Sequence, residues 1–324
     1  MKNNHLRSTQ WLVAGVLSLA LCACQKAIFR PAGQATVSIS LALPGETRTT
    51  GASSIGESRI NTLQVFIFNP DGSLESSASS SADTVRLRCR YGAKTIWAIA
   101  NAPDLSAVTT LGALAASVSR LDDNALASLV MAGDRSLTID SDRSVSIPVS
   151  RLCAKIVVGK ITKAFTSGIL QGKRLTLRRI YLTNVAGDRS FGSGGTVSLW
   201  YNRLGYQGEC DALLCDPVDR DVDPVLEETH VFYVYPNASE SAARGAPWTP
   251  RCTRLVLEAE LEGETCYYVI DLPGLESNHA YVLSDLVLTR PGAGDEESVT
   301  AASGVRFSFS VRSWTEADPY NEVL

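Results

Sequence analysis

The first clear pattern in the chain is an alternation of apolar and small residues over 37–43. Apolar side chains at every second position predict a β-strand with one buried face. Pro44 and Gly45 end this strand, and a polar link without an apolar pattern follows over residues 46–54. The predicted strand is amphipathic, and its inward positions are Val37, Ile39, Leu41 and Leu43.

The polar link is the only tether that this first strand has to the rest of the predicted fold. Within the link, a single arginine, Arg48, is followed by Thr49. Behind it, residues 60–68 form a β-branched and aromatic run that ends in a turn signal, Asn-Pro-Asp-Gly. A protease specific for arginine could therefore cut after Arg48 and leave the remaining fold short of one strand.

Most of the other patterned segments are short β-rich runs separated by turn-forming residues, which predicts a mainly β chain. Residues 85–90 alternate apolar side chains with Arg86, Arg88 and Arg90. These arginines would form a basic outer strand face, either simply solvated or available to an anionic ligand. Residues 95–101 are apolar on both sides and predict a central strand.

Two segments of the first half depart from this strand pattern. Residues 105–130 are rich in Ala, Leu and Ser and make the best helical candidate. The serine run 76–81 predicts a loop.

A second set of strands is expected after residue 150, and it suggests a second domain. The expected runs are 152–158, 175–184, 196–201, 229–235, 254–260, 267–272, 281–289 and 305–311. The last run alternates Val305, Phe307, Phe309 and Val311 with polar residues. We therefore expect two tandem domains, over residues 36–150 and 151–324.

Composition and charge support a globular protein that does not bind nucleic acid. The chain has 324 residues, of which 45% are hydrophobic and 20% are charged, as in ordinary globular domains. This length is sufficient for two domains with substantial cores. The formal net charge of −4 lacks the basic footprint of a nucleic-acid-binding protein.

The first 23 residues have the features of a signal peptide. Lys2 and Arg7 precede an apolar segment, 11–20, that is too short to anchor the chain in a bilayer. The following Leu-Cys-Ala-Cys resembles a bacterial lipobox and predicts lipidation of Cys24, with residues 24–35 as a spacer. The alternative is an ordinary signal peptide with two incidental cysteines.

Six cysteines follow Cys24, and the envelope outside the inner membrane permits disulfides. Cys210 and Cys215 close a short loop and are the first choice for a local bridge. A hairpin centred near residues 262–263 would place Cys266 opposite residue 259, which argues against a bridge to Cys252. Full pairing of six cysteines has 15 solutions, and these remain open.

The sequence points to no enzyme, cofactor or metal site. After Cys24 the chain has two histidines, His230 and His279, and neither lies in a nucleophile or metal motif. The cysteines lack a zinc-type spacing. The acidic run 219–223 has the spacing that begins a calcium loop, but it lacks the central glycine and Pro224 follows it. A catalytic carboxylate pair stays open because acidic residues are abundant.

Several motifs, taken in order, make the chain similar to the fimbrillins of Bacteroidales, the subunits of type V pili. The matching stretches are 47–49, 60–72, 97–101, 131–133, 151–158, 233–237, 278–281, 288–292 and 311–314. The resemblance implies two tandem β-sandwich domains of transthyretin-like topology and a lipoprotein precursor. It also implies proteolysis at the arginine of the first link and donor-strand exchange, in which a neighbour's strand replaces the removed one.

A structural subunit of an outer-membrane-attached, cell-surface pilus is the function that this resemblance implies. Its partners would be other fimbrial subunits and, through the lipid on Cys24, the membrane. Residues 305–311 are the candidate donor strand, or else an ordinary core strand. The alternatives are a tip adhesin, an anchor, or another envelope-anchored glycan-binding lipoprotein that contacts host or bacterial surface ligands. In such a binder, Trp200, Tyr201 and Trp248 could stack on sugars.

Overall fold

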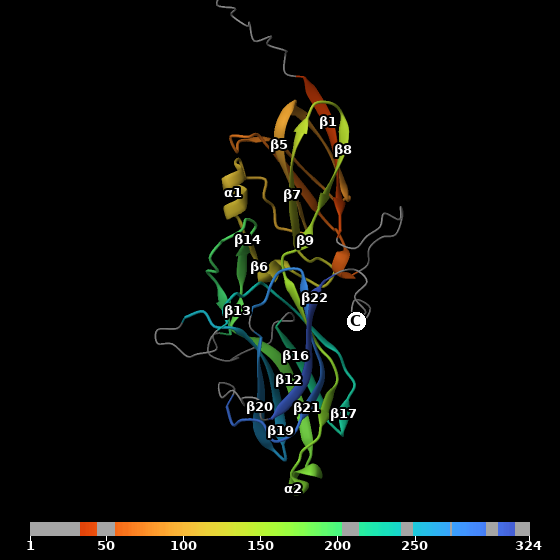
Figure 1. Ribbon diagram of the computed structural model, residues 1–324, viewed down its shortest axis with the longest axis vertical. Coiled ribbons are helices and arrows are strands. Elements are labelled where there is room, and N and C mark those ends of the chain that lie inside the picture. The colour runs from red at the N-terminus through yellow and green to blue at the C-terminus, as the bar shows by residue number, and fades with distance from the viewer. Residues whose placement is uncertain are drawn as a thin grey trace, which may run out of the picture.

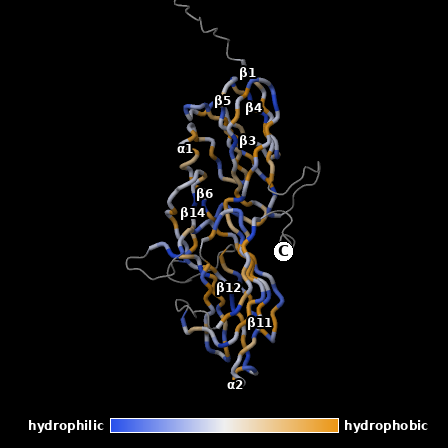
Figure 2. The backbone as a smooth tube through the Cα atoms, in the orientation of Figure 1, coloured by the Kyte–Doolittle hydropathy of each residue, from blue (hydrophilic) through white to orange (hydrophobic). Residues whose placement is uncertain are grey.

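The computed structural model describes residues 33–43, 56–202, 214–240, 249–272, 274–295 and 304–314. They form an elongated, mainly β molecule in which two sets of sheets follow one another along the long axis (Figure 1). Apolar and hydrophilic residues are interleaved along the strands of both halves (Figure 2). The expected mainly β fold is confirmed. No helix in the described part of the chain is long and apolar enough to cross a membrane.

Two sheets face each other in the first half. A three-stranded sheet has the order β4-β1-β8, and a five-stranded sheet has the order β3-β2-β5-β7-β9. The bounds are β1 Gln34–Ala42, β2 Leu63–Phe68, β3 Leu74–Ser80, β4 Thr84–Arg90, β5 Gly92–Ala100, β7 Met131–Ile139, β8 Arg143–Pro148 and β9 Ser150–Arg151. Their facing side chains form one apolar core, to which β1, β2, β4, β5, β7 and β8 all contribute.

Two larger sheets make up the second half, with orders β16-β12-β19-β20 and β17-β11-β21-β10-β18. The bounds are β10 Ala154–Val158, β11 Ile161–Lys163, β12 Leu175–Thr183, β16 Cys215–Asp221, β17 Val225–Leu226, β18 His230–Val234, β19 Thr253–Leu261, β20 Glu264–Leu272, β21 His279–Leu288 and β22 Val305–Ser313. Tyr281 of β21 pairs with Ile156 of β10 and with Val311 of β22. Therefore β22 lies along the other side of β21.

Short elements join the two halves. They are η1 Gly56–Ser58, α1 Leu111–Ala116, β6 Val118–Arg120, η2 Leu121–Asp123, β13 Val185–Ala186, β14 Asp188–Ser190 and β15 Trp200–Tyr201. Strand β6 of the first half pairs with β14 of the second. A second helix, α2 Gly168–Gln171, lies at the far end of the second half (Figure 1). The largest apolar cluster runs from Phe66 and Phe68 in β2 to Leu283 and Leu286 in β21. Because this core is continuous, the boundary between residues 150 and 151 stays a prediction.

The expectations for two segments of the first half are wrong. Of residues 105–130 only α1 is α-helical, and Thr110 caps it by accepting a hydrogen bond from the backbone N–H of Ala113 at 3.1 Å. Beyond α1, pairing of β6 with β14 provides the backbone with partners that helix formation would remove. The serine run belongs to β3, because pairing with β2 outweighs the weak strand propensity of serine. The strand expected over 196–201 is limited to Trp200–Tyr201.

Candidate assembly site

Strand β1 is the central strand of its sheet, although it is the first described strand of the chain. It pairs antiparallel with β4, from Gln34 opposite Arg90 to Ser40 opposite Thr84. On its other side it pairs parallel with β8, whose residues lie more than a hundred positions away in sequence. Removing β1 would leave unpaired backbone groups on both neighbouring strands and expose the core between them.

The inward face of β1 is almost completely buried. Val37 and Ile39 are 0% exposed and Leu43 is 8% exposed, and Leu41 is partly buried against the same core. Ala35, at 1% exposure, is a further inward residue that the sequence pattern did not single out. These side chains contact the core formed with β4, β8 and the opposite sheet. The alternation of small and apolar residues positions them, because successive side chains of a strand point to opposite faces.

Strand β22, which carries the candidate donor residues, has a very different environment. Among the described strands it pairs with β21 alone. Its apolar residues are largely solvent-exposed: Phe307 is 41%, Phe309 45% and Val311 49% exposed. Phe309 contacts Tyr281 of β21 with a ring-centroid distance of 6.2 Å. A row of exposed apolar side chains on one edge strand is a surface suited to association.

A cluster of buried polar side chains connects η1, which follows the polar link, with the residue directly after β22. Lys155 Nζ lies 2.8 Å from Glu57 Oε1, and both side chains are buried. The Tyr233 hydroxyl donates to the same Glu57 oxygen at 2.5 Å, and Trp314 Nε1 donates to Glu57 Oε2 at 3.0 Å. Burial and the neighbouring Glu57 carboxylate both raise the pKa of Tyr233, so its hydroxyl keeps its proton and donates. Glu57 is therefore the common acceptor of three different segments.

Arg151 completes this cluster from the junction between the two halves. Its guanidinium donates through Nη2 to the Ser58 hydroxyl at 2.7 Å, and through Nη1 to the Trp314 carbonyl at 3.2 Å. It also lies over the Trp314 ring, with Cζ 4.5 Å from the ring centroid. Glu57 and Ser58 follow the polar link, whereas Trp314 comes directly after β22. The cluster thus connects the segment behind the expected cleavage site with the end of the candidate donor strand.

Sequence reasoning did not assign a role to Glu57, Arg151, Lys155 or Trp314. A signal was present, because Arg151, Lys155, Tyr233, Asn278 and Trp314 all lie within the stretches that carry the family resemblance. The fold brings these separate stretches together, and the Asn278 carbonyl accepts a hydrogen bond from the Trp314 backbone N–H at 2.9 Å. Only the folded chain shows that they contact one another.

Several predicted site residues lie outside the described part of the chain. These are Cys24, Arg48, Thr49, Cys210 and Trp248. Cys215 is disulfide-bonded, and Cys89, Cys153, Cys252 and Cys266 are free and buried. The bridge between Cys210 and Cys215 therefore stays a prediction. Cys266 pairs with Ala259 across the β19–β20 hairpin, as expected.

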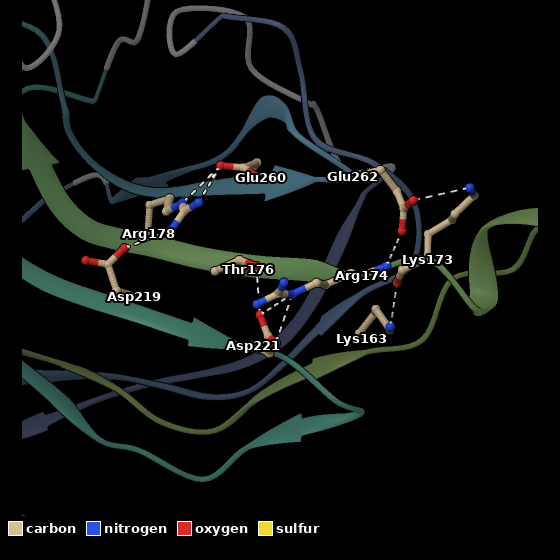
Figure 3. Close-up of polar contacts among 9 residues, drawn as sticks. All are labelled: Lys163, Lys173, Arg174, Thr176, Arg178, Asp219, Asp221, Glu260 and Glu262. Atoms are coloured by element: carbon tan, nitrogen blue, oxygen red, sulfur yellow. Dashed lines mark hydrogen bonds and ion pairs between the residues drawn. The ribbon is translucent and has the colours of Figure 1, made fainter.

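The acidic run and the candidate sugar-stacking aromatics have structural partners. Asp221 and Asp219 accept hydrogen bonds from Arg174 at 3.0 Å and Arg178 at 3.2 Å (Figure 3). Trp200 and Tyr201 are partly buried against the large core, and the Tyr201 hydroxyl donates to Asp122 at 2.9 Å. Asp219, Asp221, Trp200 and Tyr201 therefore each have a partner within the chain itself.

Comparisons with known proteins find solved structures with a similar fold. A candidate cell adhesion protein of Bacteroides eggerthii DSM 20697 is 18% identical, with a TM-score of 0.65, over 88% of this chain and 97% of its own. A FimA fimbrilin of Porphyromonas gingivalis W83 is 16% identical, with a TM-score of 0.63, over 87% and 98%. A Porphyromonas gingivalis tip fimbrial protein with a C-terminal truncation is 13% identical, with a TM-score of 0.54, over 87% and 100%. No curated protein matches the sequence.

These similarities define the class of protein as one with a fimbrillin-like, mainly β fold. The family model of the major fimbrial subunit protein (FimA) matches residues 35–179. This match covers the whole first half of the fold and extends into β12 of the second half. The resemblance to Bacteroidales fimbrillins is confirmed.

Proposed function

We propose that this protein is a structural subunit of a type V pilus and that it polymerises by strand exchange after proteolysis removes β1. The observation that carries the proposal is the position of β1. It is the central strand of its sheet, its inward side chains are buried, and the link containing Arg48 follows it directly. Cleavage after Arg48 would convert an internal strand into a separate peptide that a second strand can replace.

The energetics of β1 are compatible with such an exchange. Burial of each large apolar side chain contributes about 1.5–3 kcal/mol. Ordering the backbone costs roughly 1–2 kcal/mol per residue, which offsets much of that gain. A strand with the same alternation, supplied by another subunit, would recover the backbone pairing and the burial. Because the contact joins different surfaces of two copies, it propagates into a filament and does not close as a dimer.

Strand β22 supports the proposal as the donor. It alternates apolar and polar residues as β1 does, and its apolar row is already exposed to solvent. Moving it would give up pairing with β21 and the contacts of Trp314 with the buried cluster. In the groove left by β1, the apolar row would instead be buried.

A truncated tip fimbrial protein shares only the fold with this chain, so it does not favour a tip role.

The precursor would be a lipoprotein anchored through Cys24 in the outer membrane. We propose that each half, with its two facing sheets, is one transthyretin-like β-sandwich domain, with the boundary between residues 150 and 151. Before cleavage, β1 would keep the first sandwich complete and unable to accept a donor.

The test is to treat the purified protein with an arginine-specific protease and follow particle mass by light scattering. Wild type should be cut after Arg48, lose β1 and form large particles, whereas Arg48→Ala should stay monomeric. Arg59→Ala, at the next arginine of the chain, is the matched control and should polymerise normally. Protein that is cut and has lost β1 but stays monomeric would refute the mechanism, as would polymerisation of Arg48→Ala.

A second variant tests the donor separately. Deleting residues 305–324 should leave cleavage after Arg48 intact and block growth of particles. Normal filaments from this deletion would exclude β22 as the donor while leaving strand removal as the trigger.

A further inference from the structure

The outward face of the β4-β1-β8 sheet carries a straight row of three arginines. Arg86, Arg88 and Arg90 are exposed, and they alternate with the buried Val85, Leu87 and Cys89 on the inward face of β4. Side chains two residues apart on a strand are about 6.7 Å apart, so the row extends about 13 Å. We call these three residues the arginine row. All three belong to one strand, so the spacing between them is set by the backbone.

Most residues beside the arginine row on the neighbouring strands are small and polar. On β1, Ser38, Thr36 and Gln34 lie directly opposite Arg86, Arg88 and Arg90, respectively. On β8, Ser144 lies opposite Ser38. Hydroxyl and amide groups are suited to hydrogen bonding with a polar ligand. The small serine and threonine side chains also leave the guanidinium groups of Arg86 and Arg88 accessible.

The arginine row makes no ion pair with any residue in the described part of the chain. Outward positions of β1, β4 and β8 carry no acidic residue. Two carboxylates near this face are occupied with backbone groups: Glu75 accepts from the Arg90 N–H at 2.6 Å and Asp142 from the Thr36 N–H at 2.7 Å. Glu75 also pairs with the buried Lys94. The row therefore keeps its charge available to an external anion.

Arginines on the second half, in contrast, lie beside carboxylates and form ion pairs with them. Arg174 pairs with Asp221 at 3.0 Å, and Arg178 pairs with Glu260 at 2.5 Å and with Asp219 at 3.2 Å; Figure 3 shows these three pairs. These strands thus carry arginines together with carboxylates that neutralise them. The contrast within one chain, whose net charge is −4, sets the arginine row apart from an ordinary solvated strand face.

A cavity of about 360 Å³ lies at one end of the row. Its lining includes Arg88, Arg90 and Gln34, together with Glu75 and Asn69. A ligand that follows the row therefore finds a concave polar site at its end. Such a site has room for a sugar-sized group.

We propose that the arginine row binds a linear anionic polysaccharide that carries sulfate or carboxylate groups. A guanidinium presents a planar fork of N–H donors that matches either anion bidentately. Three positive charges in a line, with serine and threonine hydroxyls beside them, match the repeating negative charges and hydroxyls of such a polysaccharide. The outward face has no large apolar residue that could insert into a bilayer. The arginines belong to β4 and stay in place if β1 is exchanged, whereas the polar residues opposite them belong to β1. Binding by the uncleaved protein, which keeps both strands, therefore tests the site separately from the proposed assembly mechanism.

The experiment measures binding of the purified, uncleaved protein to immobilised heparin and to a polyuronate, at several salt concentrations. The test variant is R86Q/R88Q/R90Q. The matched control is R174Q/R178Q/R220Q, which removes the same formal charge from exposed arginines of the second half. Wild type and control should bind at about physiological salt, and the test variant should bind at least tenfold more weakly. Its slope of log affinity against log salt should fall by about three, one for each lost contact.

Circular dichroism should show that both triple variants keep the wild-type fold, since five of the six positions are exposed and the side chain of the sixth, Arg178, is 42% exposed. Heparin binding without polyuronate binding would assign the ligand as sulfated, and the reverse would assign it as carboxylated. Equal loss of binding in both variants would overturn the proposal, because net charge alone would then explain it. Failure of wild type to bind either polysaccharide, or binding only to phosphatidylglycerol vesicles or duplex DNA, would also overturn it.

Discussion

Replacing Glu57 by alanine should destabilise the protein far more than the loss of an ordinary ion pair. The carboxylate pairs with Lys155 at 2.8 Å and accepts hydrogen bonds from Tyr233 and Trp314. The Lys155 and Glu57 side chains are 0% and 4% exposed, so water cannot replace the lost carboxylate without rearrangement. Removing one partner of a buried ion pair costs about 3–5 kcal/mol. That is a large part of a typical unfolding free energy of about 5–15 kcal/mol.

The assay is urea unfolding of the uncleaved protein, followed by tryptophan fluorescence, because Trp314 lies inside the cluster. The matched control is Lys160→Ala, which breaks the ion pair between Lys160 and Asp285, whose side chains are 46% and 51% exposed. An exposed pair contributes about 0–1 kcal/mol. Glu57→Ala should therefore shift the unfolding midpoint several times as much as the control. Glu57→Gln, which keeps an acceptor but removes the charge, should fall between them.

A second readout tests whether the cluster holds the end of β22. Loss of the hydrogen bond from Trp314 Nε1 to Glu57 should make the C-terminal segment more sensitive to limited proteolysis in Glu57→Ala than in the control. If Glu57→Ala and Lys160→Ala shift the midpoint equally and leave proteolysis unchanged, the buried cluster does not secure these segments, and the reasoning is wrong.

Three further predictions concern individual side chains. Ile39→Ala should cost about 2–5 kcal/mol in urea unfolding because Ile39 is completely buried, whereas the outward-facing Ser38→Ala should stay within about 0.5 kcal/mol. Burial raises the pKa of Cys153 to about 12, so iodoacetamide at pH 8 should label it only after denaturation; native labelling would contradict this. The pKa of Asp221 is lowered by hydrogen bonds from Arg174 and then Thr176, so its contribution to stability is present above its ordinary value of 3.8 and is lost as pH falls through the folded value. Arg174→Gln should therefore raise the pKa of Asp221 in an NMR titration, and an unchanged value would contradict the pairing.

Local alternation was sufficient to predict the strands that later form the candidate sites. The inward residues of β1 and the outward arginines of β4 were both read from a period of two, because strand geometry alone sends alternate side chains to opposite faces. The β19–β20 hairpin was placed closely enough to put Cys266 opposite residue 259, where the structure has Ala259. The family resemblance came from short motifs, whose order does not require knowledge of their contacts.

The sequence pattern did not predict which strands pair with each other when they are far apart in the chain. Nothing in residues 34–42 indicates that the parallel neighbour of β1 is β8, or that β1 is a central strand. Pairing also turned a serine run into β3, and pairing of β6 with β14 limited the expected helix to α1. In each case a hydrogen-bonding partner distant in sequence outweighed local propensity, which differs by only about 1 kcal/mol per residue among most residues.

The sequence by itself determined the fold class, the amphipathic first strand, the basic face of β4 and the resemblance to fimbrillins. The tertiary structure alone decided the contents of the buried cluster and the exposure of β22. Glu57, Arg151 and Trp314 are far apart in the chain, and a charged or aromatic residue gives no local sign of which distant residue it will contact. Alternation shows that a strand has an apolar face, but only the packing of neighbouring sheets decides whether that face is covered.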